Sequence, residues 1–205
     1  MVLVDRSACR KGGGEGPVIY LASSSPRRRT LLKAARLRFK IVRPTYKEVH
    51  RHSGSAERLT QEHALGKAFS VMGRVREGVI LGADTVVVDG RRILGKPPTL
   101  KEAEKMLGRL QGRWHTVVTS VALIRMGQGW PQKKCLFIEK TKVRLKKMDS
   151  AMIRRYLKKI GPLDKAGAYA AQTVGEGVVE RVKGSFTNVV GLPIEKLKKN
   201  LRVLR

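Results

Sequence analysis

Apolar residues recur with two different periods along the chain, and the change between the periods predicts alternating strands and helices. A short apolar run at 18–21, followed by Ser25 as a helix N-cap, predicts a strand that leads directly into a helix. The run VILGADTVVV at 79–88 is nearly continuous, which is typical of a central strand covered on both faces. Asp-Gly at 89–90 predicts a turn into a short return strand at 92–94.

The same criteria place the remaining elements. Further strands are expected at 39–43, 114–124, 135–145, 178–182 (VVERV) and 186–190 (FTNVV), with MGQG at 126–129 as a loop. Further helices are expected from Ser55 to about Gly73, from Thr99 to about Gly112, from 149 or 150 to 160, and from Pro193 onward. This order of strands and helices predicts an α/β fold with a mixed sheet.

Two helices carry more specific expectations. Thr99 followed by Glu102 matches a capping box, in which each side chain bonds the backbone N–H of the other. The helix that begins at 149 or 150 is expected to place four residues inward: Met152, Ile153, Tyr156 and Ile160.

The length of 205 residues permits one large core or two closely joined lobes. Residues 1–16 contain KGGGEG without periodicity and are predicted to be a flexible N-terminal extension, which leaves 17–205 as a single domain. No run approaches 18 apolar residues and no secretory signal is visible, so we expect no membrane insertion. Two isolated cysteines, Cys9 and Cys135, are consistent with a reducing cytoplasm.

Charge is the strongest compositional feature. The chain has 44 Lys and Arg against 16 Asp and Glu, a formal net charge of +28, which predicts anionic partners. Aromatic residues make up only 5%, whereas dedicated RNA-binding surfaces add stacking aromatics. Dense basic regions at 133–159 and 196–205 keep a nonspecific nucleic-acid-binding protein as a competing hypothesis, and a host cytoplasm of unusual salt or acidity is a third explanation.

Three arginines, Arg27, Arg28 and Arg29, lie in the first turn of the helix that Ser25 begins. The helix dipole disfavours a cation there by roughly 0.3–1 kcal/mol each. A helix N-terminus is at the same time a ready site for an anion, so the cluster indicates either a bound anion or a solvated basic patch.

Asp84 is the most unusual single residue, because it interrupts an apolar strand where a buried, unpaired carboxylate costs several kcal/mol. It indicates either a cleft where a cation meets the strand or a strand-end aspartate that caps a loop. Glu48 lies in a polar loop and could join Asp84 around Mg²⁺, although an isolated glutamate is more often a surface residue.

Lys67 and Lys96 are candidate cations for an anionic substrate. Lys96 follows the hairpin after Asp84, so it can return to the same end of the sheet, although most lysines in such a chain are only solvated. His50, His52, His63 and His115 show no metal-binding spacing and are assigned to the surface or to packing. The P-loop sequence GxxxxGK[ST] is absent.

Four segments, LASSSPRRRTLL, GADTVVV with LGKP, LDKAGAYAAQ and GSFTNVVGLP, together resemble the Maf family of nucleotide pyrophosphatases. The resemblance covers about residues 18–205 and keeps the family's order and spacing. It implies an α/β fold related to the inosine-triphosphate pyrophosphatases, with the active site in a cleft between two lobes. It also implies hydrolysis of a nucleoside triphosphate to the monophosphate and pyrophosphate with Mg²⁺ or Mn²⁺. The oligomeric state is open, with a homodimer as one expectation.

The resemblance also implies roles for individual residues. Ser25 and Arg28 match the family's phosphate-handling positions, Glu48 and Asp84 its acidic positions with Asp84 as the catalytic aspartate, and Lys67 and Lys96 its lysines. Base preference divides the family, and three positions match the dTTP/UTP branch rather than the 7-methyl-GTP branch: Arg27, Thr85 and Gln172.

Overall fold

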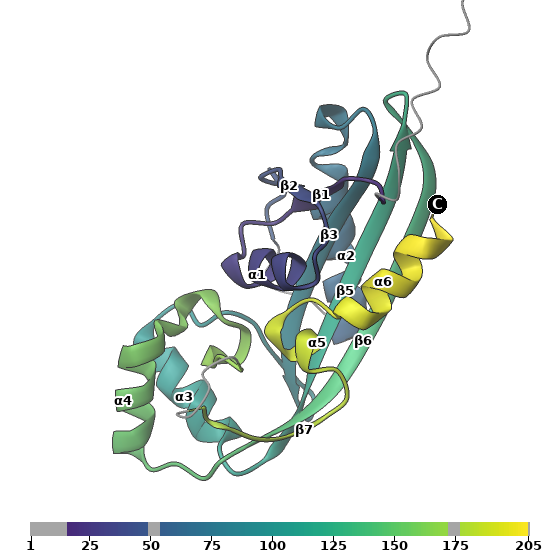
Figure 1. The fold of residues 1–205 in the computed structure, drawn as a ribbon. Coiled ribbons are helices and arrows are strands. Elements are labelled where there is room, and N and C mark those ends of the chain that lie inside the picture. The colour runs from purple at the N-terminus through teal and green to yellow at the C-terminus, as the bar shows by residue number, and fades with distance from the viewer. Residues whose placement is uncertain (1–15, 49–53, 172–176, 205) are drawn as a thin grey trace, which may run out of the picture.

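The computed structural model describes residues 16–48, 54–171 and 177–204, and its centre is one seven-stranded mixed sheet (Figure 1). The strand order is β2-β1-β3-β5-β6-β7, with β4 beside β3. β1 runs parallel to both β2 and β3, whereas the other pairs are antiparallel. The strands are β1 Ile19–Ala22, β2 Phe39–Ile41, β3 Gly78–Asp89, β4 Arg92–Leu94, β5 Trp114–Gly127, β6 Trp130–Leu145 and β7 Val179–Lys183.

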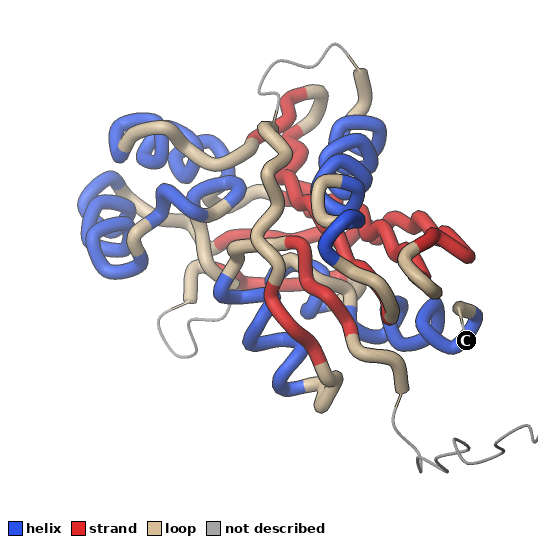
Figure 2. Tube along the Cα trace, turned by 90° about the horizontal axis from the view of Figure 1, so that it is seen from above, coloured by secondary structure: helices blue, strands red, loops and turns tan. Residues whose placement is uncertain are grey.

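Helices cover both faces of this sheet (Figures 1 and 2). α1 and α6 pack on one face, and α2 packs on the other against β3 and β5. The helices are α1 Pro26–Ala34, α2 Ala56–Phe69, α3 Leu100–Leu110, α4 Ser150–Ile160, α5 Phe186–Val190 and α6 Ile194–Val203, with 3₁₀ turns η1 Met72–Arg74, η2 Pro162–Asp164 and η3 Ala166–Ala168.

Strand β3 is apolar almost throughout because both of its faces are covered. Val79, Leu81 and Ala83 point into the core with α1 and α6, whereas Ile80 points into the core with α2. The alternation follows from the two-residue period of a strand. It also sends the next two residues, Asp84 and Thr85, to opposite faces of the sheet.

A second lobe is built on the far ends of β3, β5 and β6. Helices α3 and α4 pack there with the turns η2 and η3 around a separate apolar core, seen at the lower left of Figure 1. The predicted mixed α/β fold with two lobes is therefore confirmed. Fully or nearly fully buried members of this second core include Val87, Ala103, Leu107, Leu110, Val117, Val143, Leu145 and Ala168.

The expected strand at 186–190 is wrong, because FTNVV forms helix α5. Ser185 is its N-cap and accepts a hydrogen bond from the backbone N–H of Asn188 at 3.1 Å. Gly191 ends it with φ of 119°, a left-handed conformation that glycine adopts without strain. The β-branched residues favour a strand in isolation, but the two caps and the packing of the segment favour the helix.

Three smaller expectations also need correction. Strands β5 and β6 extend further than predicted, so only 128–129 form the turn where a loop was expected at 126–129. Met152 is 42% exposed instead of inward-facing, and Leu157 takes that place in the core of the second lobe. Thr99 caps α3 through the N–H of Glu102, but the Glu102 carboxylate pairs with Lys105.

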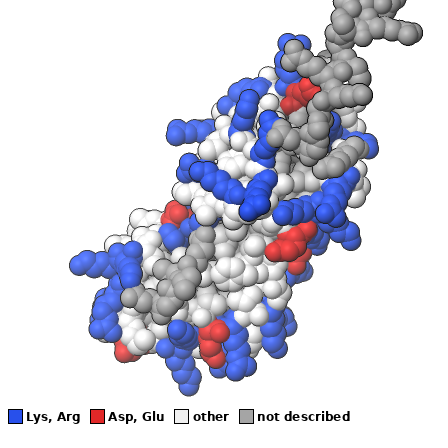
Figure 3. Space-filling model, viewed as in Figure 1, with Lys and Arg blue, Asp and Glu red and all other residues white. Residues whose placement is uncertain are grey.

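Basic side chains are spread over both lobes on the face shown in Figure 3, with few acidic side chains between them. None of the helices in the described ranges has the length and apolarity needed to cross a bilayer. The predicted extension at 1–16 lies outside the described residues except for Gly16.

Candidate active site

The site lies where the parallel strands β1 and β3 separate. Their pairing ends at Ala22 and Gly82, and β3 continues past this point to Asp84 and Thr85 without β1, while it stays paired with β5. A cavity of about 390 Å³ opens here between the two lobes. Most of the residues that the sequence singles out line it: Ser25, Arg28, Glu48, Lys67, Asp84, Thr85 and Lys96.

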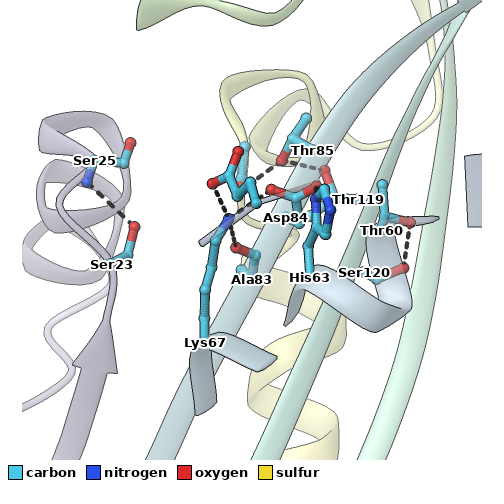
Figure 4. Close-up of polar contacts among 12 residues, drawn as sticks. Ser23, Ser25, Thr60, His63, Lys67, Ala83, Asp84, Thr85, Thr119 and Ser120 are labelled. Carbon is cyan, nitrogen blue, oxygen red and sulfur yellow. Dashed lines mark hydrogen bonds and ion pairs between the residues drawn. The ribbon is translucent and has the colours of Figure 1, made fainter. Parts of the chain in front are cut away.

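Helix α2 reaches this cavity because it packs unusually close to β3 at Gly82. A Cβ at this position would lie 2.1 Å from the carbonyl oxygen of Ala64, so a larger residue does not fit. The close packing brings side chains of α2 against Asp84, two residues further along the same face of β3. Figure 4 shows Lys67 and His63 pointing from α2 toward Asp84.

Lys67 connects the two predicted acids. Its ammonium group lies 2.6 Å from Oδ1 of Asp84 and 2.8 Å from Oε1 of Glu48. Lys67 and Asp84 are buried, whereas Glu48 is about one-quarter exposed at the wall of the cavity. The structure therefore brings together three residues that are far apart in the sequence.

His63 contacts the second oxygen of Asp84. Its Nδ1 lies 3.2 Å from Oδ2, and both side chains are at least nine-tenths buried. Because an ionised carboxylate only accepts hydrogen bonds, Nδ1 carries the hydrogen and donates it. The two oxygens of Asp84 thus have different partners, Lys67 and His63.

These partners keep the carboxylates ionised. Burial alone would raise the pKa of Asp84, but the hydrogen bond from His63 and the charge of Lys67 lower it to about 2. Burial also opposes ionisation of Glu48, and the ammonium of Lys67 outweighs it and lowers the pKa of Glu48. Both residues carry negative charge at neutral pH.

Thr85 and Arg28 form a second polar group on the opposite face of β3. Arg28 is buried and donates to the carbonyl oxygen of Gly191 at 2.9 Å, to Oγ of Ser23 at 3.1 Å and to Oγ1 of Thr85 at 3.1 Å. Thr85 is also hydrogen-bonded to Thr119. These acceptors of Arg28 are neutral, so they orient the guanidinium group without neutralising its charge. Burial lowers the pKa of Arg28.

The other predicted residues have different surroundings. Lys96 is more than half exposed, with Nζ 3.8 Å from Oε2 of Glu48. Ser25 is the N-cap of α1, although its side chain makes no capping hydrogen bond. Arg27 points to the second lobe, where it donates to the carboxylate of Asp164 at 3.1 Å and to its carbonyl oxygen at 2.9 Å. Gln172 lies outside the described residues.

The acidic residues fit a divalent cation. Donor atoms of Glu48, His63 and Asp84 all lie within 4.8 Å of one another. Carboxylate oxygens suit Mg²⁺ and Mn²⁺, and an imidazole nitrogen suits transition metals. The donor set therefore accepts a metal ion, although it does not by itself select one.

His63 is the residue that sequence reasoning missed. The sequence alone assigns it to the surface or to packing, because no histidine here has the spacing of a known metal motif. A usable signal was present: His63 precedes Lys67 by four residues and therefore lies on the same face of a helix. Tyr46 also lines the cavity, and its ring lies 5.8 Å from that of His63.

Comparison with known proteins shows what the whole chain is similar to. A family model described as "Maf-like protein" matches residues 18–204. A protein of Gloeobacter violaceus named dTTP/UTP pyrophosphatase is 43% identical over 180 residues, covering 87% of this chain and 92% of the relative. One of Thermosipho melanesiensis with the same name is 41% identical over 179 residues, 87% and 93% of the two chains. A solved structure of a nucleoside-triphosphatase / dITP/XTP pyrophosphatase from Mycobacterium abscessus is a distant likeness, with a TM-score of 0.41 and 16% identity over 62% of this chain and 72% of that one.

Proposed function

The chain belongs to the Maf family, and from this premise we propose that it hydrolyses dTTP and UTP to the nucleoside monophosphate and pyrophosphate. The names of relatives about 40% identical over most of their length support the substrates. The observation that carries the proposal is the Asp84–Lys67–Glu48 cluster at the wall of a cavity between the lobes, in which Asp84 and Lys67 are buried. A role in removing unwanted nucleotides follows from this activity.

The basic residues around the cavity bind the triphosphate. Arg28 is held in place by neutral oxygens and keeps its charge for a phosphate. Lys96 lines the same cavity close to Glu48, and the start of helix α1 at Ser25 adds its partial positive charge. Together with Lys67 they stabilise the negative charge that develops on the leaving pyrophosphate, which is the main requirement of phosphoryl chemistry.

Glu48 and Asp84 would hold a divalent metal, Mg²⁺ or Mn²⁺, with their carboxylate oxygens. When bound, such an ion polarises phosphate oxygens and neutralises part of their charge. Asp84 acts chiefly through its charge, because a carboxyl group with a pKa of about 2 is a weak proton acceptor near neutral pH. Lys67 holds the two carboxylates close together and offsets their repulsion.

Three residues select the pyrimidine base: Arg27, Thr85 and Gln172. Thr85 lines the cavity and is fixed by hydrogen bonds to Arg28 and Thr119. Arg27 lies at the edge of the second lobe through its contacts with Asp164. The alternative is that the chain prefers 7-methyl-GTP, as the other branch of the family does. The substrate assay described next distinguishes the two preferences.

The test is pyrophosphate release measured over the common ribo- and deoxyribonucleoside triphosphates and 7-methyl-GTP, with Mg²⁺ or Mn²⁺. We expect dTTP and UTP to be hydrolysed with the highest kcat/KM, and activity to disappear when the metal is chelated. Equal inactivity on all of these substrates would contradict the proposed function. Preference for 7-methyl-GTP would keep the reaction and overturn the proposed base specificity.

Other expectations from the sequence stay predictions. These are a single domain over 17–205, a location in the cytoplasm, a homodimer, and nonspecific binding of nucleic acid through the basic surface. Nucleic-acid binding would weaken steeply with salt and would not depend on Asp84, so it can be separated from catalysis.

A further inference from the structure

We propose that His63 is a third protein ligand of the divalent metal, through Nδ1, beside Asp84 and Glu48. The proposal rests on the proposed function only in assuming that a metal binds at these two carboxylates. It adds a nitrogen donor to a site that the sequence assigns to oxygen donors alone. The kind of metal that the site prefers changes as a consequence.

The distances are those of neighbouring ligands on one ion. Nδ1 of His63 lies 3.2 Å from Oδ2 of Asp84. Two ligands at right angles, with bonds of about 2.1 Å, stand about 3.0 Å apart, and tetrahedral ligands stand only slightly further apart. The nearest donor atoms of Glu48 complete the group within 4.8 Å. Two of the three side chains therefore stand at ligand spacing already.

The imidazole ring is held in this orientation from several sides. It projects from the second half of helix α2, where His63 is only 5% exposed. The ring of Tyr46 packs beside it, with the two ring centroids 5.8 Å apart and an interplanar angle of 60°. Tyr46 in turn lies against Gly66 so closely that a Cβ there would be 2.3 Å from the tyrosine ring. A pre-oriented donor loses little conformational freedom when it binds an ion.

The competing explanation is that His63 only orients Asp84 by donating a hydrogen bond. Both explanations predict that His63 matters for activity, so loss of turnover does not distinguish them. They differ in what is attached to Nδ1 when the metal is present. A ligand bonds the metal through a bare Nδ1, with the ring hydrogen on Nε2, whereas an orienting residue keeps the hydrogen on Nδ1 and donates it to the carboxylate of Asp84.

The two explanations also predict different metal preferences. Mg²⁺ strongly prefers oxygen, whereas imidazole nitrogen suits ions such as Co²⁺ and Zn²⁺. Removing a nitrogen ligand should therefore weaken Co²⁺ binding by about 10-fold or more, with Mg²⁺ binding changed less than about 3-fold. Removing an orienting hydrogen bond should weaken both ions to a similar degree.

The decisive experiment is pulsed electron paramagnetic resonance of Mn²⁺ bound to the full-length protein without nucleotide. A directly bound imidazole gives a ¹⁴N coupling, which becomes a ¹⁵N coupling when the protein contains ¹⁵N-histidine. We compare the wild type with His63→Leu and His63→Gln. His115→Gln is the matched control, since His115 is also a buried histidine but contacts Tyr169 in the second lobe.

We expect the nitrogen coupling in the wild type and in His115→Gln, and its loss in both His63 variants while Mn²⁺ still binds. Wild-type protein with bound Mn²⁺ and no histidine coupling would overturn the proposal. A coupling that survives in the His63 variants would also overturn it, because the nitrogen would belong to another residue. Pyrophosphate release is measured separately. The nitrogen coupling to bound Mn²⁺ can therefore be interpreted even if the protein does not catalyse the proposed reaction.

Discussion

The two buried histidines of the described residues show how differently the two halves of the molecule treat polar groups. His63 contacts Asp84, which lines the cavity, and donates to its carboxylate, which is ionised with a pKa of about 2. His115, in the core shared with the second lobe, bonds the hydroxyl of Tyr169 at 2.8 Å and meets its ring edge-on. Burial lowers the pKa of His115 to about 4, so it is neutral at pH 7.

The difference distinguishes a reactive site from a packed core. In the second lobe, burial suppresses charge, which is the ordinary result of moving an ionisable group out of water. At the base of the cavity, charge persists despite burial because Lys67 and His63 both contact Asp84. Clusters of buried, ionised groups beside a cavity are more common at functional sites than in cores.

The largest expected effect comes from removing charge at the cavity. Asp84→Asn should lower kcat for dTTP by about 10²–10⁴-fold, because it removes the charge that Lys67 faces and one of the two carboxylates proposed to hold the metal. Lys67 keeps Glu48 as a partner, so the fold should persist. Steady-state pyrophosphate release and circular dichroism check both points.

The matched control for this variant is Asp89→Asn. Asp89 ends the same strand but pairs with Arg109 in the second lobe. It should keep kcat within about 3-fold of wild type, since only the charge at the cavity contributes to transition-state stabilisation. Wild-type kcat in Asp84→Asn, or equal losses in both variants, would contradict the assignment of catalysis to the cavity.

A smaller effect is expected from the neutral histidine. The pKa of His115 is about 4 in the folded protein and about 6.5 in the unfolded chain, so between these values the unfolded chain binds the proton more readily. The contribution of the neutral His115 to the free energy of unfolding is therefore fully present above about pH 6.5. It is lost as the pH drops toward 4, which lowers the free energy of unfolding by about 3 kcal/mol. Urea unfolding at several pH values measures it.

His115→Gln removes this titration and keeps a group able to hydrogen-bond Tyr169. The free energy of unfolding of this variant should therefore fall less than that of the wild type between pH 6.5 and 4. The other titrating groups are the same in both proteins, so their contributions cancel in the difference. Identical slopes would show that His115 does not resist protonation, and the contrast with the cavity would fail.

The smallest effect concerns the contact between the lobes. Arg27 and Asp164 are partly exposed, so their ion pair should contribute less than about 1 kcal/mol to stability. Arg27→Trp should nevertheless lower kcat/KM for dTTP by about 10-fold relative to 7-methyl-GTP, if Arg27 selects the base. Asp164→Asn breaks the same ion pair and keeps Arg27, so its selectivity should stay close to wild type. Unchanged selectivity in Arg27→Trp would place base recognition elsewhere.

Local patterns in the sequence were sufficient for most of the fold. The covered strand β3, its hairpin to β4, and the caps of α2 and α3 follow from short-range rules that the structure obeys. Residues 186–190 are predicted wrongly as a strand because their β-branched side chains favour a strand, whereas the caps at Ser185 and Gly191 favour a helix. A rule based on composition cannot weigh these opposing signals.

The site was predicted only in part. Asp84 stands out in the sequence because a charge inside an apolar strand is costly, whereas Glu48, Lys67 and Lys96 are only weak candidates until the family resemblance implies roles for them. The contact of His63 with Asp84 joins α2 to β3 across 21 residues and depends on the close packing at Gly82. No local pattern encodes that approach, so His63 emerged only from the structure.

The most direct test of the proposed reaction is to hydrolyse dTTP in H₂¹⁸O and identify both products. Attack of water at the α-phosphorus predicts dTMP that carries one ¹⁸O, together with unlabelled pyrophosphate, formed at least about 100-fold more slowly by Asp84→Asn than by the wild type. Release of dTDP and inorganic phosphate, or label in the pyrophosphate, would contradict the proposed cleavage between the α and β phosphates.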